Sequence, residues 1–154
     1  MAKETIPEIL KKIGEINSFK DRVYALRMAA VNNPVIQKCI KFCYRSDIIW
    51  DLPEGTPPYK PLDMPDNWGY NRIPVEARKF TYFTKGNGVK RLKREQMLIE
   101  MLESVSPEEA KLLIDIKDGD IKIKNITKKL AIEAFPDSFK KDPEVLKDVQ
   151  DTKE

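Results

Sequence analysis

The fold class follows most directly from residues 33–44, whose sequence is NPVIQKCIKFCY. Asn33 is a residue type that caps helices, and Pro34 suits the first turn of a helix, where its missing N–H needs no partner. The apolar residues that follow recur at helical spacing, which is typical of one buried face: Val35, Ile36, Ile40 and Cys43. The stretch therefore predicts a helix from Pro34 to about Arg45, with Asn33 as its cap.

The two cysteines of the chain, Cys39 and Cys43, lie four residues apart within this apolar run. The spacing places both thiols on one helix face, where we expect them to pack in the core in the reduced form. A disulfide or redox pair is the weaker interpretation. The N-terminus has no apolar signal region and no stretch approaches the roughly 20 apolar residues of a membrane span, so we expect a cytoplasmic protein without membrane contact.

Helical periodicity continues on both sides of residues 33–44. We expect two helices before them, at about 6–16 and 18–33, and four after them, at about 74–83, 90–104, 106–116 and 125–135. Ser18 is expected to cap the second helix, and the run Ser106-Pro107-Glu108-Glu109 is a capping box with proline at the first helical position. In the helix at 90–104 the residues expected to face inward are Leu92, Met97, Leu98, Met101 and Leu102.

Residues 47–72 interrupt the helices with prolines and aromatic residues. Each proline removes a hydrogen-bond donor and restrains the residue before it, which favours an extended crossing segment. We expect its aromatic side chains to pack it onto the helices. The chain is therefore predicted to be all-α: a single-domain bundle of about six to seven helices over residues 1–136, followed by a charged, flexible tail at 137–154.

The 154 residues contain no histidine, which excludes Ser-His-Asp and Cys-His enzymes. Two cysteines cannot build the common zinc sites either. Gly86-Asn87-Gly88 lacks the Gly-Lys-Ser/Thr ending of a nucleotide P-loop, and Asp118-Gly119-Asp120 lacks the remaining ligands of a calcium loop. We therefore expect no catalytic residue, no metal and no cofactor.

The positive charge of the chain is unevenly distributed. The formal net charge is +3, and because residues 137–154 carry −2, residues 1–136 carry +5. Residues 85–94 contain five positive charges and no negative one, and residues 117–129 contain five lysines against two aspartates. Glycine turns and helix starts expose backbone N–H groups that favour anions, so each window is a candidate contact for the phosphate backbone of DNA, with a solvated lysine-rich face as the alternative. The candidate DNA-binding residues are Lys85, Gly86, Asn87, Gly88, Lys90, Arg91, Lys93, Arg94, Lys122, Lys124, Asn125, Thr127, Lys128 and Lys129.

Several runs together resemble the N-terminal helical DNA-binding domain of ATP-dependent DNA ligases, those of bacteriophages in particular. The runs are residues 9–16, Lys20-Asp21-Arg22, residues 33–38, Phe42-Cys43-Tyr44 and residues 121–129, and the resemblance covers most of residues 5–136. It implies a helical bundle that grips duplex DNA through its backbone across the minor groove, without reading sequence. It also implies that the loop at residues 85–94 and the turn at residues 122–127 are the two DNA contacts.

The chain departs from that family in two respects. The glycine of the second turn is replaced by Lys124 or Asn125, and asparagine tolerates the left-handed conformation. There is no nucleotidyltransferase domain and no Lys-x-Asp-Gly motif, so we expect neither a ligase nor another enzyme. The chain also resembles small proteins of tailed phages, for which the compartment would be the cytoplasm of the host.

Two functional hypotheses follow. The leading one is non-enzymatic, largely sequence-independent binding of duplex DNA, intact or nicked, through the two basic windows. The alternative is a phage protein-interaction module that binds a host or replication protein through the segment at residues 50–70. Its contact residues would be the aromatic ones: Trp50, Tyr59, Trp68 and Tyr70. The sequence does not specify an oligomeric state.

Overall fold

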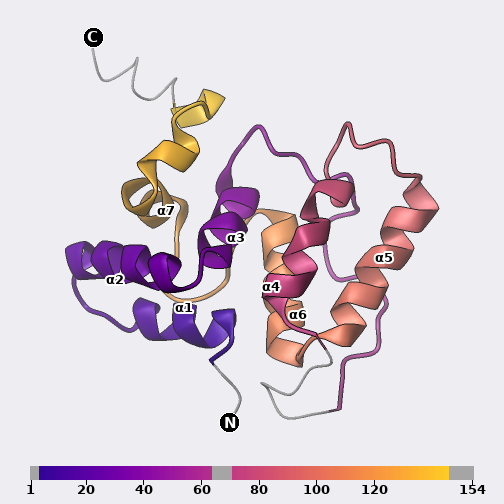
Figure 1. Ribbon diagram of the computed structural model, residues 1–154, viewed down its shortest axis with the longest axis horizontal. Helices are drawn as coiled ribbons and strands as arrows, with labels where there is room; N and C mark the ends of the chain where they lie inside the picture. The colour runs from indigo at the N-terminus through magenta and orange to yellow at the C-terminus, as the bar shows by residue number, and fades with distance from the viewer. Residues whose placement is uncertain (1–3, 64–70, 146–154) are drawn as a thin grey trace.

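Helix α3 (Val35–Tyr44) runs through the middle of the fold, between two groups of helices (Figure 1). One group consists of α1 (Ile6–Gly14), α2 (Phe19–Asn32) and α7 (Lys128–Ala134), which is followed by a short 3-10 helix, η2 (Pro136–Phe139). The other consists of α4 (Ile73–Glu76), its 3-10 continuation η1 (Ala77–Phe83), α5 (Arg91–Ser104) and α6 (Pro107–Asp118). The computed structural model describes residues 4–63 and 71–145, and these ranges contain no strand, only an isolated antiparallel bridge between Trp50 and Thr84. The all-α prediction is confirmed.

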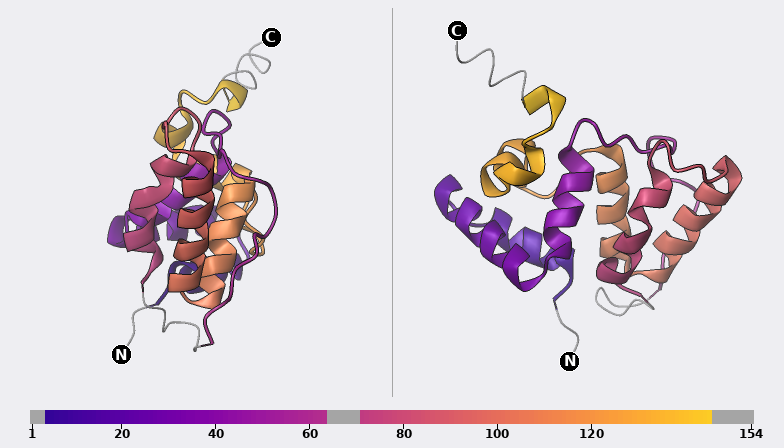
Figure 2. Two further views of the ribbon diagram at one scale, coloured as in Figure 1. Left: turned by 90° about the vertical axis from the view of Figure 1, so that its right-hand side faces the viewer. Right: turned by 45° about the horizontal axis from the view of Figure 1, so that its top comes forward.

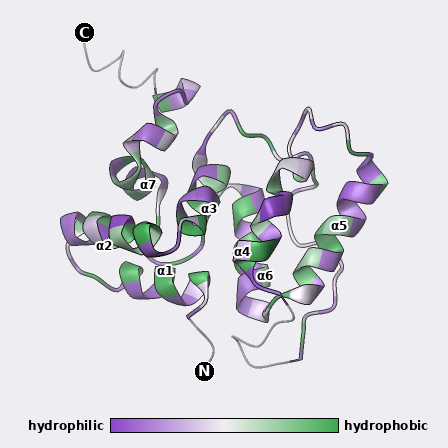
Figure 3. Ribbon diagram, viewed as in Figure 1, coloured by the Kyte–Doolittle hydropathy of each residue, from purple (hydrophilic) through white to green (hydrophobic). Residues whose placement is uncertain are grey.

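The core lies around α3, which packs against α2, α6, α7 and η1. Hydrophobic residues concentrate where α3, α4 and α6 face one another (Figure 3). The inward face of α3 is fully buried or nearly so: Ile36, Cys39, Ile40 and Cys43. Both thiols are free, and burial raises the pKa of Cys39 to about 12 and that of Cys43 well above its ordinary value. The prediction that the two cysteines pack in the core without a disulfide is confirmed.

Side-chain caps mark four helix starts in the described residues. The hydroxyl groups of Thr5, Ser18, Ser106 and Thr127 accept hydrogen bonds from the backbone N–H groups three residues further on. The predicted caps at Ser18 and Ser106 are confirmed. The predicted cap at Asn33 is wrong, because the N–H of Asn33 donates to Ala29 and closes α2, which leaves Pro34 as the N-cap of α3 without a side-chain bond.

Two other helices differ from their predicted bounds. The helix expected at residues 74–83 has a single α-helical turn before it narrows to the 3-10 form. The last helix begins at Lys128 rather than at residue 125, because Asn125 takes a left-handed backbone conformation (φ 63°) and Thr127 caps the helix that follows. The chain between α6 and α7 is therefore a structured turn. None of the described helices is both long and apolar enough to cross a membrane.

The described part of the crossing segment packs onto the helices, as predicted. The indole N–H of Trp50 donates to the carbonyl of Phe42 (2.9 Å), and its ring stacks on Phe83 at a centroid distance of 5.9 Å. Further along, the Lys117 ammonium donates to the carbonyl of Pro53 (2.7 Å), and the Asp118 carboxylate accepts from the backbone N–H of Gly55. These bonds hold the proline-rich segment against the C-terminal end of α6.

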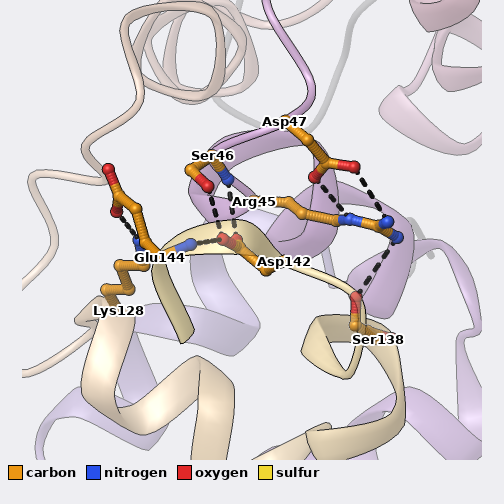
Figure 4. Close-up of polar contacts among 7 residues, drawn as sticks. All are labelled: Arg45, Ser46, Asp47, Lys128, Ser138, Asp142 and Glu144. Carbon is orange, nitrogen blue, oxygen red and sulfur yellow. Dashed lines mark hydrogen bonds and ion pairs between the residues drawn. The ribbon is translucent and has the colours of Figure 1, made fainter. Parts of the chain in front are cut away.

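The C-terminal segment is packed further than we expected from its charge. We predicted a flexible tail from residue 137, but Phe139 and Asp142 are both completely buried. The Asp142 carboxylate accepts hydrogen bonds from the backbone N–H of Ser46 (2.8 Å), from the Ser46 hydroxyl and from the N–H of Glu144 (2.9 Å) (Figure 4). The folded part of the chain therefore extends beyond the predicted boundary at residue 136. Residues 146–154 lie outside the described residues.

The Asp142 carboxylate carries a testable pH dependence. Burial acts to raise its pKa, but the hydrogen bonds from Ser46 and Glu144, together with the nearby Lys128 ammonium, lower the pKa overall. Its contribution to stability is therefore complete above the unfolded-state pKa of about 3.9 and is lost as the pH falls through the lower folded-state value. We expect Asp142→Asn to reduce the free energy of unfolding by about 2 kcal/mol at neutral pH. In urea titrations the difference from the parent protein should shrink in acid.

Asp137→Asn is the matched control, because Asp137 is exposed and lies in the same segment. It should change the free energy of unfolding by less than about 0.5 kcal/mol at either pH. Equal effects of the two substitutions would contradict a specific role for the Asp142 bonds.

Candidate functional site

The glycine-rich loop at residues 85–90 is anchored where it leaves η1. Thr84 and Trp50 form an isolated antiparallel β-bridge. Two backbone hydrogen bonds accompany it: the N–H of Lys85 donates to the carbonyl of Ile49 (2.9 Å), and the N–H of Asp51 donates to the carbonyl of Phe83 (2.7 Å). Gly86 and Gly88 have φ angles of 90° and 88°, a region that side-chain-bearing residues rarely adopt. The two glycines therefore let the chain turn sharply just beyond a fixed base.

Arg94 fastens the other end of this loop. Its Nε donates to the carbonyl of Asp51 (3.1 Å), one terminal nitrogen lies 3.1 Å from the Asp51 carboxylate, and the other donates to the carbonyl of Val89. The side chain is only 12% exposed. Arg94 was predicted to contact DNA, but its guanidinium is already engaged within the fold, so its role is to position the loop.

The remaining cations of this window are exposed. Lys85, Lys90 and Lys93 form no ion pair within the described ranges, whereas Arg91 pairs with Glu95 one turn along α5 (3.1 Å). Lys90 is the N-cap of α5 and makes no side-chain cap bond, and the first turn holds no acidic residue. Three unpaired lysines therefore surround a glycine loop and a helix start without a side-chain cap. We call Lys85, Lys90 and Lys93 the lysine triad.

Leu92 lies within this window and is not where we predicted. Of the residues expected to face inward in α5, Leu98, Met101 and Leu102 are buried and Met97 is half-buried, but Leu92 is 81% exposed. About two and a half helical turns separate Leu92 from Met101, which puts the two residues on opposite faces. The inward position of the first turn is occupied by Arg94, four residues before Leu98.

The second window forms a tight turn against α1. The side-chain amide of Asn125 donates to the carbonyl of Gly14 (2.8 Å), and Thr127 caps α7. Gly14 approaches the turn so closely that a Cβ atom there would lie 2.1 Å from the carbonyl oxygen of Lys124. As predicted, Asn125 supports the left-handed turn, and both Asn125 and Thr127 are used in building it.

Most cations of the second window have partners within the protein. Lys122 pairs with Asp115 (3.6 Å), Lys128 with Glu144 (2.6 Å), and the Lys129 ammonium lies 5.3 Å from the ring centre of Phe19. Lys124 is exposed and unpaired in the described part of the chain. It borders a cleft of about 430 Å³ between α1, α6 and the turn, where acidic side chains alternate with basic ones: Lys11, Glu15, Glu108, Lys111, Asp115, Lys122 and Lys124.

Sequence reasoning did not find this cleft, because Lys11 and Lys111 come from distant helices and neither lies in a basic run. Its mixed charge makes it a weaker anion site than the first window. In the described residues no cluster of three or more His, Cys, Asp and Glu side chains could hold a metal.

The two windows are not joined into one groove. The glycine loop leads into α5 towards one end of the long axis of the molecule, whereas the second turn leads into α7 in the opposite half (Figures 1 and 2). The lysine triad is thus the candidate site with the greatest unpaired charge, and the second window is chiefly a structural turn.

The aromatic residues proposed for a protein partner are largely used inside the fold. Trp50 is half-buried, contacts three aromatic rings and donates its N–H internally. Tyr59 is half-buried against the core, and burial raises its pKa. Trp68 and Tyr70 lie outside the described residues.

Comparison with known proteins gives one family. Residues 9–123 match the model of DUF6433, a family of unknown function. The chain belongs to this family. The match to DUF6433 includes the whole glycine loop and lysine triad, and it ends within the second window, before Asn125. No curated protein and no solved structure matches the chain.

Proposed function

We propose that this DUF6433 protein is a non-enzymatic DNA-binding protein that holds duplex DNA by its phosphate backbone, with little reading of sequence. The observation that carries the proposal is the lysine triad: three exposed, unpaired ammonium groups around the loop of Gly86 and Gly88. Phosphate contacts of this kind supply most of the affinity of sequence-independent binding. Under this proposal the protein acts in the cytoplasm. If it is a phage protein, this is the cytoplasm of the host cell.

The local backbone supports the same proposal. The first N–H groups of α5 have no side-chain acceptor, and positive potential at a helix start favours anions such as phosphate. The loop that carries Lys85 and Lys90 is fixed at both ends, so that little ordering of its backbone is needed on binding. The resemblance to the ligase DNA-binding domain points to the same loop as a backbone contact.

A salt titration tests the proposal. If the triad neutralises three phosphates, the logarithm of the association constant should fall against the logarithm of salt concentration with a slope of about −3. Fluorescence anisotropy of a short labelled duplex, titrated with the full chain between about 50 and 200 mM salt, measures this slope. Duplexes of unrelated sequence should give the same values. An unchanged anisotropy at the lowest salt would overturn the proposal.

A protein partner remains the second hypothesis for the segment at residues 50–70. The observed packing of Trp50 and Tyr59 leaves the triad as the better-supported site. The two hypotheses separate on one comparison: reversal of Lys90, Arg91 and Lys93 to glutamate should abolish cellular function under the DNA proposal, and Trp68→Ala should abolish it under the alternative.

A further inference from the structure

Leu92 is an apolar side chain presented to solvent among cations. Its 81% exposure is the highest among the exposed large hydrophobic residues of the described chain, which also include Tyr24 and Val31. Lys90, two residues before it, and Lys93, the next residue, are both unpaired. The first turn of α5 lies at the right-hand edge of the molecule in Figure 1, and this side faces the viewer in the left view of Figure 2.

The position of Leu92 is fixed by the rest of the helix. The arginine two residues later binds Asp51 and Val89 and so determines how the first turn of α5 is rotated. With Arg94 directed inward and Met101 buried on the same side, Leu92 points away from the core. An exposed leucine is common on protein surfaces. A fixed, outward leucine close in sequence to two unpaired lysines is a more specific arrangement, because it places an apolar group and positive charge at the same end of α5.

We propose that Leu92 is an apolar wedge that inserts between stacked base pairs of duplex DNA while Lys85, Lys90 and Lys93 hold the adjacent phosphates. This inference rests on the DNA-binding function proposed above. A single aliphatic side chain that enters from the minor groove is sufficient to unstack one base step. The partner would therefore be duplex DNA that is kinked at the bound step, rather than DNA held straight along its backbone.

The chemistry around Leu92 fits DNA better than the other polyanionic surface, an anionic membrane. Stable attachment to lipid requires a broad apolar face or a long acyl chain, because even a myristoyl group alone binds only marginally. The following turns of α5 expose Gln96 and Glu100 and leave Glu95 half-exposed, and the one apolar residue on the same face, Ile99, is half-buried, so no broad exposed apolar face extends from Leu92 along the helix. One leucine suffices for a base step but not for a bilayer.

Two measurements on one DNA test the wedge. The duplex carries a fluorescent dye for anisotropy and 2-aminopurine, whose fluorescence rises when it is unstacked. The full chain should raise the 2-aminopurine signal at saturation, and Leu92→Ala should reduce that rise at least about threefold. The dissociation constant should change less than about tenfold, because the gain from burying leucine and the cost of unstacking oppose one another. Leu92→Phe should retain the signal.

Gln96→Ala is the matched control on the next turn of the same helix, and it should behave as the parent protein does. If the parent protein binds without a rise in 2-aminopurine fluorescence, or if Leu92→Ala gives the full rise, the wedge is wrong and the DNA-binding function stands. If the parent protein does not bind the duplex at low salt, both proposals fall. Leucine-dependent binding to vesicles of equal parts phosphatidylglycerol and phosphatidylcholine, without DNA binding, would assign the site to membranes instead.

Discussion

Replacing Gly14 with alanine is expected to lower the free energy of unfolding by at least about 3 kcal/mol. The added Cβ would lie 2.1 Å from the carbonyl oxygen of Lys124, a backbone atom that cannot swing aside as a side chain could. The turn is also held in place by the Asn125 amide, which donates to Gly14 itself. Relief of the collision requires α1 and the turn to separate, which breaks this bond. Urea denaturation followed by circular dichroism measures the loss.

The expected destabilisation by Gly14→Ala is opposite in sign to the usual effect of this substitution in a helix. At an unobstructed helical position, alanine in place of glycine stabilises by up to about 1 kcal/mol. Glu15→Ala, at the exposed neighbouring residue, is the matched control and should change the free energy by less than about 0.5 kcal/mol. A Gly14→Ala protein that melts at or above the parent temperature would show that α1 does not approach the turn as closely as the structure has it.

The features that sequence reasoning predicted are those with local causes. The spacing of Ile36, Ile40 and Cys43 predicts the buried face of α3, because a helix repeats over a few residues whatever surrounds it. The caps at Ser18 and Ser106 are likewise bonds to residues three positions away. Asn33 does not cap α3 because it lies between two helices. Its backbone N–H donates to Ala29 and ends α2 instead.

The features that sequence reasoning missed depend on contacts between distant residues. The close approach of Gly14 to Lys124 joins the end of α1 to the turn before α7, and no local pattern distinguishes this glycine from any other. In the sequence, Asp142 is one of several charged residues in a polar C-terminal segment, and only the structure shows that Ser46 donates a hydrogen bond to it. For the same reason the charge pattern of residues 117–129 predicted an anion site without showing that Asp115 and Glu144 neutralise part of it.

In the first basic window, residues 85–94, the count of charges identified exposed cations, but it did not separate paired from unpaired ones. Counting charge treats Arg94 and Lys93 alike, whereas the structure buries the guanidinium against Asp51 and leaves the ammonium in solvent. Arginine suits this internal role because its planar group donates to several acceptors at once. The lysines, which form no ion pair in the described part of the chain, remain available to an external anion.

Reversal of the lysine triad to glutamate, as Lys85→Glu, Lys90→Glu and Lys93→Glu combined, is expected to weaken DNA binding at least about 100-fold near 100 mM salt. The variant loses three favourable phosphate contacts and places carboxylates where phosphates would lie. All three side chains are exposed and unpaired in the described residues, so the fold should keep its melting temperature. Anisotropy titration measures the affinity, and the salt slope should fall towards zero.

The matched control reverses three exposed lysines outside both windows, Lys20, Lys140 and Lys141, which changes the formal net charge by the same amount. Because counterion release depends on which phosphates are contacted, this variant should lose less than about tenfold in affinity and keep its slope. Equal losses in the two variants would mean that overall charge, rather than the glycine loop, attracts DNA. A greater loss on reversal of Lys122, Lys124 and Lys128 would move the site to the turn beside α1, where Asp115 and Glu144 already compete with phosphate.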